Sequence, residues 1–290
     1  MPRTHHHSLN DKVAFNMKSI LAVLSALFLA VMFSTARASD EEYPHRAKFK
    51  NIPVMEAATL HKDLKSVLVV DVRSLYEYET LHIKGAVHIK LSKEKLPADV
   101  KALRAKSPAT PIVFYCNGHT CKKSYEAAEL CMNAGVSNVF AYDAGIDAWT
   151  KLYPDQSVLL GKSPVQPSEF ISHDEFKKRL ISTQNFEAMV EKGAVVLDIR
   201  DLRQRDVVLF PMRELRAPLD DSQKIADAVM QAKKSKKALL VYDKVGKQTR
   251  WFQYYLEQQG VKDYYFLDGG AEAYHEAKYG KLNFKVPEQG

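Results

Sequence analysis

The sequence predicts an α/β protein made of two tandem copies of one domain, each with a central, mostly parallel sheet flanked by helices. Short runs rich in Val, Ile and Leu alternate with helical patterns, as expected for strands that are buried on both faces of a parallel sheet. Similar segments recur in the two halves of the chain at near-constant spacing, which indicates a repeat. The length of 290 residues fits two domains of about 100–150 residues each.

The patterns of the first half give its elements in order. We expect a strand at 67–72, a strand at 86–90, a helix at 96–105, a strand at 111–115, a helix at 121–134, a strand at 138–142 and a helix at 145–152. Gly135 ends the longest of these helices, and Gly260 does the same in the second half. Ligands of open α/β sheets bind at the carboxyl ends of the strands, so the residues after 111–115 are the first place to look for a site.

Three pairs of segments carry the repeat. Residues 67–73, 111–116 and 142–149 are echoed by residues 194–200, 238–243 and 267–274, at offsets of 127, 127 and 125 positions. A polar, proline-containing stretch separates the halves. We therefore expect an upstream extension and signal peptide at 1–38, a first domain at 39–160, a linker at 161–168 and a second domain at 169–290.

The N-terminal residues have the pattern of a secretory signal peptide. Lys18 precedes the apolar stretch Ile20–Phe33, and Ala36-Arg37-Ala38 provides a small-x-small cleavage site. The apolar stretch is shorter than the ~20 residues that span a bilayer. We expect cleavage before Ser39, a periplasmic or secreted protein, and no stable membrane span after cleavage.

Charge and cysteine content exclude two classes of protein. The 42 basic and 35 acidic residues leave a modest excess of +7. The basic run at 233–237 precedes a strand and is typical of a solvated helix end, so we expect no nucleic-acid partner. The cysteines are Cys116, Cys121 and Cys131, too few for a disulfide scaffold. Cys131 lies in a helical pattern and is expected in the core.

Cys116 is the candidate nucleophile. It follows an expected strand and precedes a short loop with Gly118, after which a helical pattern begins near Lys122. Backbone N–H groups and the positive end of a helix dipole stabilise a thiolate in such a loop. They can lower the pKa of a thiol from about 8.5 to roughly 3.5–7.5. This position favours sulfur chemistry over a packing role.

Several motifs together resemble the rhodanese superfamily. They are Asp71-Val72-Arg73, Glu77, the segment His82–Ile89, the loop after Cys116 and the segment Asp143–Trp149. The second half keeps Asp198-Ile199-Arg200 and Asp268-Gly269-Gly270 but has Leu209–Met212 where the first has His82–Ile89, and Asp243 where the family has its cysteine. The resemblance implies two rhodanese-like domains, with the cysteine in the N-terminal copy. Many tandem members carry it in the C-terminal copy.

The resemblance also implies a thiosulfate sulfurtransferase-like activity without cofactor or metal. Cys116 would take a sulfane sulfur from thiosulfate or a persulfide and pass it to a thiol or cyanide. The loop residues Asn117, Gly118, His119, Thr120 and Cys121 would form the anion cradle, with Lys122 and Lys123 adding positive potential. Asp71, Arg73 and Glu77 would support the site, and a structural ion pair is the simpler role for Arg73 and Glu77. Asp243 cannot accept sulfur, so the second domain should be inactive and should buttress the first or cover its mouth.

Three alternatives remain open from the residues alone. Phosphatases and arsenate reductases of a related fold use Cys-x5-Arg, but here that position is Lys122, which lacks the planar fork of arginine. Cys116 and Cys121 could form a redox pair in which Cys121 resolves a persulfide or protects the nucleophile. The chain could also be a non-enzymatic binding module that leaves the persulfide site unused.

The signal-peptide pattern predicts a mature N-terminus at or next to Ser39, because the small residues Ala36 and Ala38 precede it. N-terminal sequencing of the protein purified from the envelope fraction of its host tests this. A native protein that begins within residues 1–16, or one recovered only from the cytoplasm, would contradict the prediction.

Overall fold

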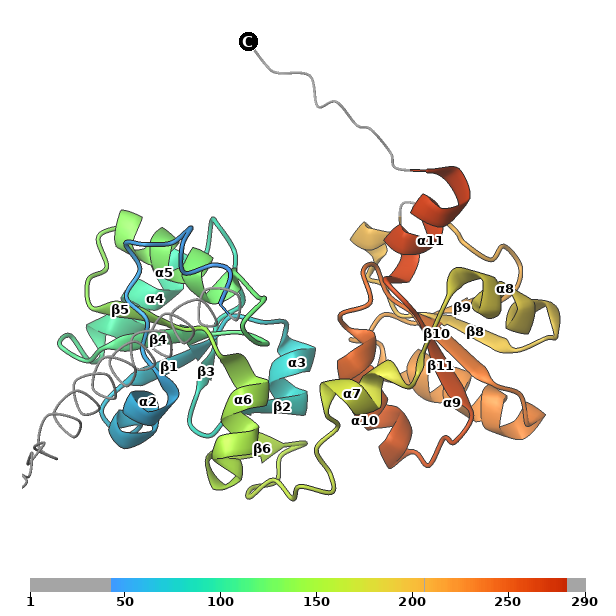
Figure 1. Cartoon of the computed structure of the whole chain (residues 1–290), viewed down its shortest axis with the longest axis horizontal. Coiled ribbons are helices and arrows are strands. Elements are labelled where there is room, and N and C mark those ends of the chain that lie inside the picture. Colours follow the sequence, from blue (N-terminus) through green and yellow to red (C-terminus); the bar gives the residue numbers. More distant parts are fainter. Residues whose placement is uncertain (1–42, 206, 281–290) are drawn as a thin grey trace, which may run out of the picture.

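The computed structural model describes residues 43–205 and 207–280, which form two sheet-containing α/β domains (Figure 1). The expected signal peptide and cleavage site lie outside these residues. In the part of the chain that is described, no helix has both the length and the hydropathy needed to cross a bilayer.

The first sheet consists of parallel strands in the order β3 (Val87–His88), β1 (Leu68–Asp71), β4 (Ile112–Tyr115) and β5 (Val139–Tyr142). An additional parallel bridge joins Val54 to Ala141 at the β5 edge. All four residues of β4 are buried, as expected for a central strand covered on both faces.

Helices cover both faces of this sheet. Consecutive strand residues point to opposite faces, and here both faces carry apolar side chains that pack against helices. Ile112 and Phe114 pack in a core with α4 (Leu96–Ala105) and α5 (Lys123–Asn133). Val113 and Tyr115 pack in the opposite core with α2 (Ala57–Asp63) and α6 (Gly145–Leu152). Cys131 is fully buried in the first of these cores, as predicted.

Every element expected of the first half is present, with ends shifted by at most two residues. Sequence patterns missed α2, the short helix α3 (Leu75–Thr80), and the antiparallel pair β2 (Leu81–Ile83) and β6 (Ser157–Leu159). A 3-10 turn, η1 (Pro154–Gln156), precedes β6.

The second sheet repeats the strand order of the first. Its parallel strands are β7 (Leu180–Ile181), β11 (Tyr264–Leu267), β10 (Leu239–Tyr242), β8 (Val195–Asp198) and β9 (Glu214–Arg216). The surrounding helices are α7 (His173–Lys177), α8 (Thr183–Glu191), η2 (Leu202–Gln204), α9 (Ser222–Ser235), α10 (Thr249–Gln258) and α11 (Gly270–Tyr279). β7 occupies the edge that the Val54 bridge occupies in the first sheet. The basic run 233–237 is exposed at the end of α9, as predicted.

The two domains meet where α10 contacts α3 (Figure 1). Trp251 of α10 is buried and packs in the same core as Leu81 and Tyr115 of the first domain. Tyr254, one turn later, packs in the same core. The first turn of α10 is therefore part of the interface between the domains.

Candidate active site

Cys116 lies at the carboxyl end of β4, between β1 and β5, and is fully buried. Its carbonyl oxygen accepts the backbone N–H of Ile146, in the first turn of α6, at 3.0 Å. The central strand β4 and the first turn of α6 therefore both fix the backbone of the cysteine. This is the edge of the sheet at which the sequence predicted a site.

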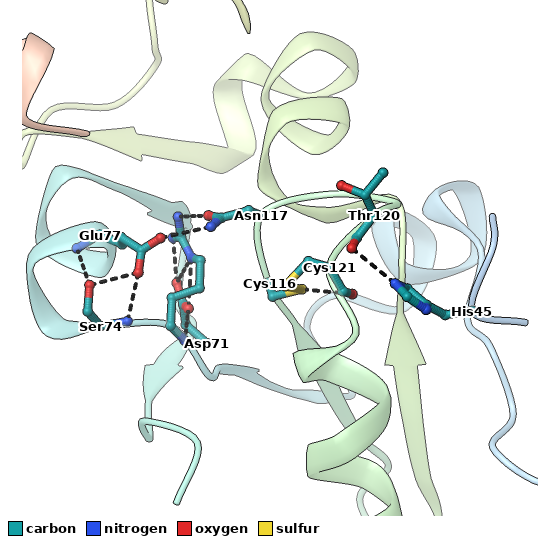
Figure 2. Close-up of a disulfide and its surroundings, with 9 residues drawn as sticks. His45, Asp71, Ser74, Glu77, Cys116, Asn117, Thr120 and Cys121 are labelled. Atoms are coloured by element: carbon teal, nitrogen blue, oxygen red, sulfur yellow. Dashed lines mark hydrogen bonds and ion pairs between the residues drawn. A yellow bond between two sulfur atoms is a disulfide. The ribbon is translucent and has the colours of Figure 1, made fainter. Parts of the chain in front are cut away.

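A disulfide joins Cys116 to Cys121, so the site is in its oxidised form (Figure 2). The Cα atoms of the two residues are 6.4 Å apart, inside the range of roughly 4.4–6.8 Å that disulfides require. The Cys116 Sγ also lies 3.3 Å from the carbonyl oxygen of Cys121. The Cys121 N–H donates to the Gly118 carbonyl at 2.8 Å and not to the sulfur, so the loop is folded on itself in this form.

Asn117 connects the cysteine loop to Arg73 and to Glu77, and Figure 2 shows the contact with Glu77. Its Nδ2 donates to Glu77 Oε1 at 2.8 Å, and its Oδ1 accepts from Arg73 Nη1 at 3.1 Å. Both ends of the amide are thus occupied, which fixes its orientation. The predicted gathering of Arg73 and Glu77 near Cys116 is therefore achieved through the residue that follows the cysteine.

Glu77 is a buried carboxylate with several hydrogen-bond donors. The backbone N–H and the hydroxyl of Ser74 donate to its Oε2 at 3.0 and 2.7 Å, and Gln248 Nε2 donates to the same oxygen at 3.1 Å. Burial pushes the pKa of Glu77 upward. The charges of Arg73 and Lys123 and the bonds from Asn117 and Ser74 outweigh it, so the pKa is lower than usual. Glu77 is therefore ionised at neutral pH.

The expected ion pair between Arg73 and Glu77 is wrong, because Arg73 pairs with Asp71. Arg73 Nη2 lies 2.6 Å from Asp71 Oδ2, and both side chains are fully buried. The carboxylate two residues back in the chain satisfies the guanidinium, which leaves only Nη1 for Asn117. Burial alone would lower the pKa of Arg73, but the adjacent Asp71 charge and hydrogen bonds raise it above its usual value.

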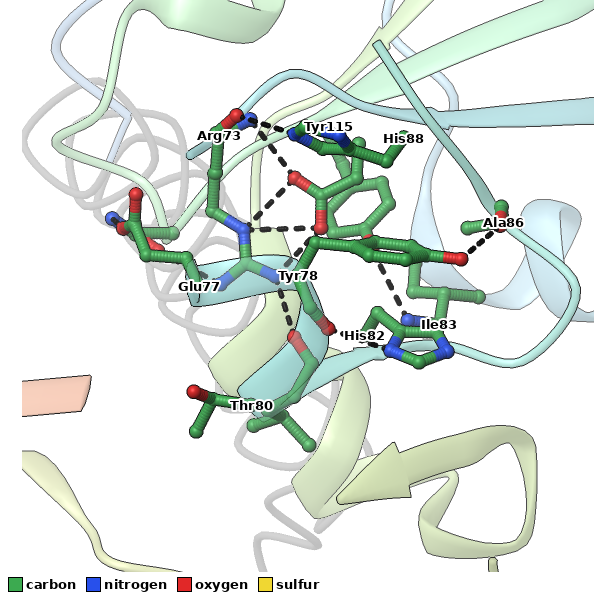
Figure 3. A network of polar contacts seen from close by, with 12 residues as sticks. Arg73, Glu77, Tyr78, Thr80, His82, Ile83, Ala86, His88 and Tyr115 are labelled. Atoms are coloured by element: carbon green, nitrogen blue, oxygen red, sulfur yellow. Dashed lines mark hydrogen bonds and ion pairs between the residues drawn. The ribbon is translucent and has the colours of Figure 1, made fainter. Parts of the chain in front are cut away.

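The segment His82–Ile89 contacts the Arg73 backbone and the tyrosines next to it (Figure 3). His88 Nε2 lies 3.0 Å from the Arg73 carbonyl oxygen, and the hydroxyl of Tyr115 accepts the Ile83 N–H at 3.2 Å. The Tyr78 hydroxyl donates to the Ala86 carbonyl at 2.9 Å. These contacts give the motif a scaffolding role, at a distance from the sulfur.

The outer part of the loop is exposed and contacts the N-terminal segment of the described chain. His119 and Thr120 are exposed, and the Thr120 carbonyl lies 3.0 Å from His45 Nε2. The ring of Tyr43 meets the ring of His119 edge-on at 6.2 Å. Sequence patterns gave no indication of His45, because nothing local marks a residue that lies next to a loop 75 positions away.

The two lysines at the start of α5 have different surroundings. Lys122 is mostly exposed and pairs with Glu126 at 2.8 Å, so its charge is partly offset. Lys123 is half-buried, and its charge contributes to the low pKa of Glu77. Among the described residues, no group of three or more His, Cys, Asp and Glu side chains could hold a metal ion.

In the corresponding loop of the second domain, backbone N–H groups surround an anion, which is the carboxylate of Asp243. The Asp243 carboxylate accepts the backbone N–H groups of Gly246, Gln248 and Thr249. Burial raises the pKa of Asp243 above its usual value, although these hydrogen bonds oppose the rise. At the offset of 127 positions, the three donors correspond to His119, Cys121 and Lys122.

Comparison within the chain separates scaffold from site. The Asp71–Arg73 pair recurs as Asp198–Arg200, with Arg200 Nη2 2.9 Å from Asp198 Oδ2. At the same offset, however, Gln204 and Lys244 occupy the positions of Glu77 and Asn117. The hydrogen bond between Glu77 and Asn117 is therefore specific to the domain that has the cysteine.

Comparison with known proteins agrees with this geometry. Residues 55–152 match the rhodanese-like domain family. A thiosulfate sulfurtransferase GlpE of Stutzerimonas stutzeri is 31% identical over 106 residues, which cover 37% of this chain and 89% of that protein. A protein of the same name from Pseudomonas fluorescens is 28% identical over 38% of this chain and 94% of its own length. The chain therefore belongs to the rhodanese family through its first domain.

Among solved structures, a thiosulfate sulfurtransferase from Pseudomonas aeruginosa is similar over 78% of this chain and 42% of its own, with 17% identity and a TM-score of 0.36.

Gly145 closes the site from the side of α6 and predicts a sensitive position. It has φ +73°, and a Cβ there would overlap the backbone of Asn117 and Gly118. We expect Gly145→Ala to displace the cysteine loop. It should lower the free energy of unfolding by about 2 kcal/mol more than Gly135→Ala does. Gly135 is the matched control, because it has φ +82° but no atom within 4 Å of the added Cβ. Denaturant unfolding of both variants measures the difference, and equal losses would contradict the prediction.

Proposed function

We propose that the chain is an exported sulfurtransferase that moves a sulfane sulfur from a donor such as thiosulfate to a thiophilic acceptor through a persulfide on Cys116. The observation that carries the proposal is the place of Cys116, buried at the carboxyl end of the central strand in a loop fixed by Asn117 and Ile146. We also propose the domain limits 39–160 and 169–290, joined by 161–168.

The first half-reaction is a displacement at sulfur by the reduced site. The Cys116 thiolate attacks the outer sulfur of thiosulfate, a bond forms between the two sulfurs, and the sulfur–sulfur bond of thiosulfate breaks. Sulfite leaves with the bonding electron pair, and Cys116 carries a persulfide anion. Covalent catalysis of this kind requires a stabilised thiolate and donors for the transferred sulfur.

The Asp243 cradle indicates which donors the first domain would use. Its three N–H groups correspond to those of His119, Cys121 and Lys122, which a reduced and relaxed loop would turn toward the persulfide. The half-buried Lys123 adds positive potential for an anionic donor, whereas the charge of Lys122 is partly offset by Glu126. In the second domain a carboxylate already occupies the cradle, so no sulfur can enter.

The second half-reaction returns the enzyme to its thiolate. A thiolate or cyanide attacks the outer sulfur of the persulfide, takes it as a persulfide or thiocyanate, and leaves the electron pair on Cys116. Neither half-reaction requires a cofactor. A chain that only binds ligands would leave the persulfide unformed, which makes persulfide formation the discriminating observation.

We expect the fully reduced protein to gain the mass of one sulfur atom on Cys116 when it is incubated with thiosulfate. Cys116→Ser should gain none, because a serine hydroxyl does not accept the sulfur. Cys131→Ala is the control and should gain sulfur normally, because burial raises the pKa of the Cys131 thiol to about 12 and keeps it unreactive. Intact mass and peptide mapping measure the gain. A reduced protein that takes no sulfur from thiosulfate or from a small organic persulfide would support the binding module instead.

The disulfide favours a second candidate function, in which Cys116 and Cys121 form a redox pair. The Cys121 thiol would attack Cys116 Sγ of the persulfide, form the disulfide and release the outer sulfur as hydrosulfide, which takes the Cys121 proton. An external dithiol would then reduce the disulfide and restore both thiols. The Cα separation of 6.4 Å allows this bond without displacement of the strand or the helix.

Under this second function, Cys121→Ser should retain the persulfide after loading. The unmodified protein should gain the sulfur only transiently, and then release hydrosulfide and end two hydrogen atoms lighter than the reduced protein. Oxidised protein should take up no sulfur until a dithiol is added. Peptide mapping of the Cys116–Cys121 bridge and a hydrosulfide assay measure both effects. Equal persulfide lifetimes in the two proteins would show that Cys121 does not resolve the persulfide.

A further inference from the structure

The first turn of α10, in the domain that lacks the cysteine, contacts the helix α3 of the first domain. Gln248 Nε2 donates to Glu77 Oε2 at 3.1 Å, and Gln248 Oε1 accepts from the Ser74 hydroxyl at 3.3 Å. The other oxygen of Glu77 accepts from Asn117 at 2.8 Å. A chain of two side chains thus links the second domain to the residue next to Cys116.

The same turn of α10 contacts the other element that holds the cysteine loop. Arg250 Nη1 and Nη2 donate to the two oxygens of Asp147 at 2.5 and 2.8 Å. Asp147 lies in the first turn of α6, next to Ile146, whose N–H donates to the Cys116 carbonyl. The Arg250 side chain is only 11% exposed, so water weakens this pair much less than it weakens a surface pair.

Asp243 holds this turn in place. Its carboxylate accepts the backbone N–H groups of Gln248 and Thr249, the residues that begin α10. Trp251, in the same turn, packs against the guanidinium of Arg73, whose central carbon lies 4.9 Å from the centre of the Trp251 ring. Asp243, which stands at the position that corresponds to Cys116, therefore orders the part of the second domain that faces the Cys116 site.

We infer that the second domain positions the Cys116 loop for sulfur transfer, with Gln248 and Arg250 as positioning residues that act through Glu77 and Asp147. This inference rests on the proposed function. The second domain lacks a cysteine of its own, and the inference assigns it a role in the reaction of the first domain. That role depends on two contacts of the interface, Gln248 with Glu77 and Arg250 with Asp147.

Electrostatics explains why Gln248 matters. A buried carboxylate is stable only while its oxygens have donors. Without Gln248, Glu77 Oε2 would keep only Ser74, and the carboxylate would turn toward other donors. Asn117 would follow, since its Nδ2 donates to Glu77, and the backbone beside the sulfur would lose its fixed orientation. The absence of a Glu77 equivalent in the second domain, where Gln204 stands, agrees with a role confined to the active copy.

The test compares variants of the full, reduced chain. We expect Gln248→Ala and Arg250→Gln each to lower kcat for sulfur transfer about tenfold, an effect of the size expected when a charged group loses its hydrogen-bond partner, with a smaller change in KM. Gln248→Glu should be worse, because it places a second carboxylate beside Glu77. The pH at which Cys116 is alkylated at half its maximal rate should rise in all three, because misaligned donors stabilise the thiolate less. A loss of global stability alone would not move that pH.

Matched controls are available in the same domain. Gln223→Ala removes an exposed glutamine that bonds Asp227, and Arg213→Gln removes an exposed arginine that pairs with Glu191. Both should retain the kcat and the alkylation profile of the unmodified protein. Arg250→Lys, which keeps the charge but not the fork, should fall between Arg250→Gln and the unmodified protein.

Two outcomes separate the inference from the function on which it rests. If the unmodified protein forms the persulfide and Gln248→Ala and Arg250→Gln, folded by circular dichroism, match it in kcat and in the alkylation pH, the positioning role is wrong and the sulfurtransferase stands. If the unmodified protein forms no persulfide, the proposed function fails, and the alkylation pH of the same variants still decides whether the second domain orders the Cys116 loop.

Discussion

The buried carboxylate of Glu77 is the constraint on which the site depends. An ionised carboxylate taken out of water must be surrounded by donors, and removing one partner of a buried charge typically costs about 3–5 kcal/mol. Glu77 meets this requirement with donors from three places: the cap of α3 at Ser74, the cysteine loop at Asn117, and the second domain at Gln248. Satisfying one charge therefore fixes a helix terminus, the cysteine loop and the domain interface together.

The two domains show the same scaffold with and without a cysteine in the loop after the central strand. Both keep the buried Asp–Arg pair at the end of the first central strand, in which the arginine lies over the tyrosine of the next strand, at 5.6 Å in the first domain and 5.2 Å in the second. The loop that follows that tyrosine differs. In the first domain it presents sulfur, and in the second Asp243 fills the cradle with its own carboxylate. The pair is thus a property of the fold, and the loop decides the chemistry.

Local sequence signals predicted the parallel sheet of the first domain, its helices α4, α5 and α6 and the place of Cys116, because buried parallel strands and helix ends have short-range patterns. Helix α3 could also have been found, since Ser74 and Glu77 form a capping box that is visible in the sequence. The contacts of His45 and Gln248 could not. They join residues 75 or more positions apart and depend on how segments and domains pack, which no local pattern encodes.

The residue that corresponds to Cys121 in the second domain shows how the loops of the two domains differ. At the offset of the repeat that position is Gln248, whose N–H is held by Asp243 and whose amide contacts Glu77. In one copy the residue at this place in the loop forms a bond to the Cys116 sulfur, and in the other it contacts Glu77 across the interface. A loop without a cysteine is ordered here by its internal carboxylate, and an ordered loop is what a fixed contact with the first domain requires.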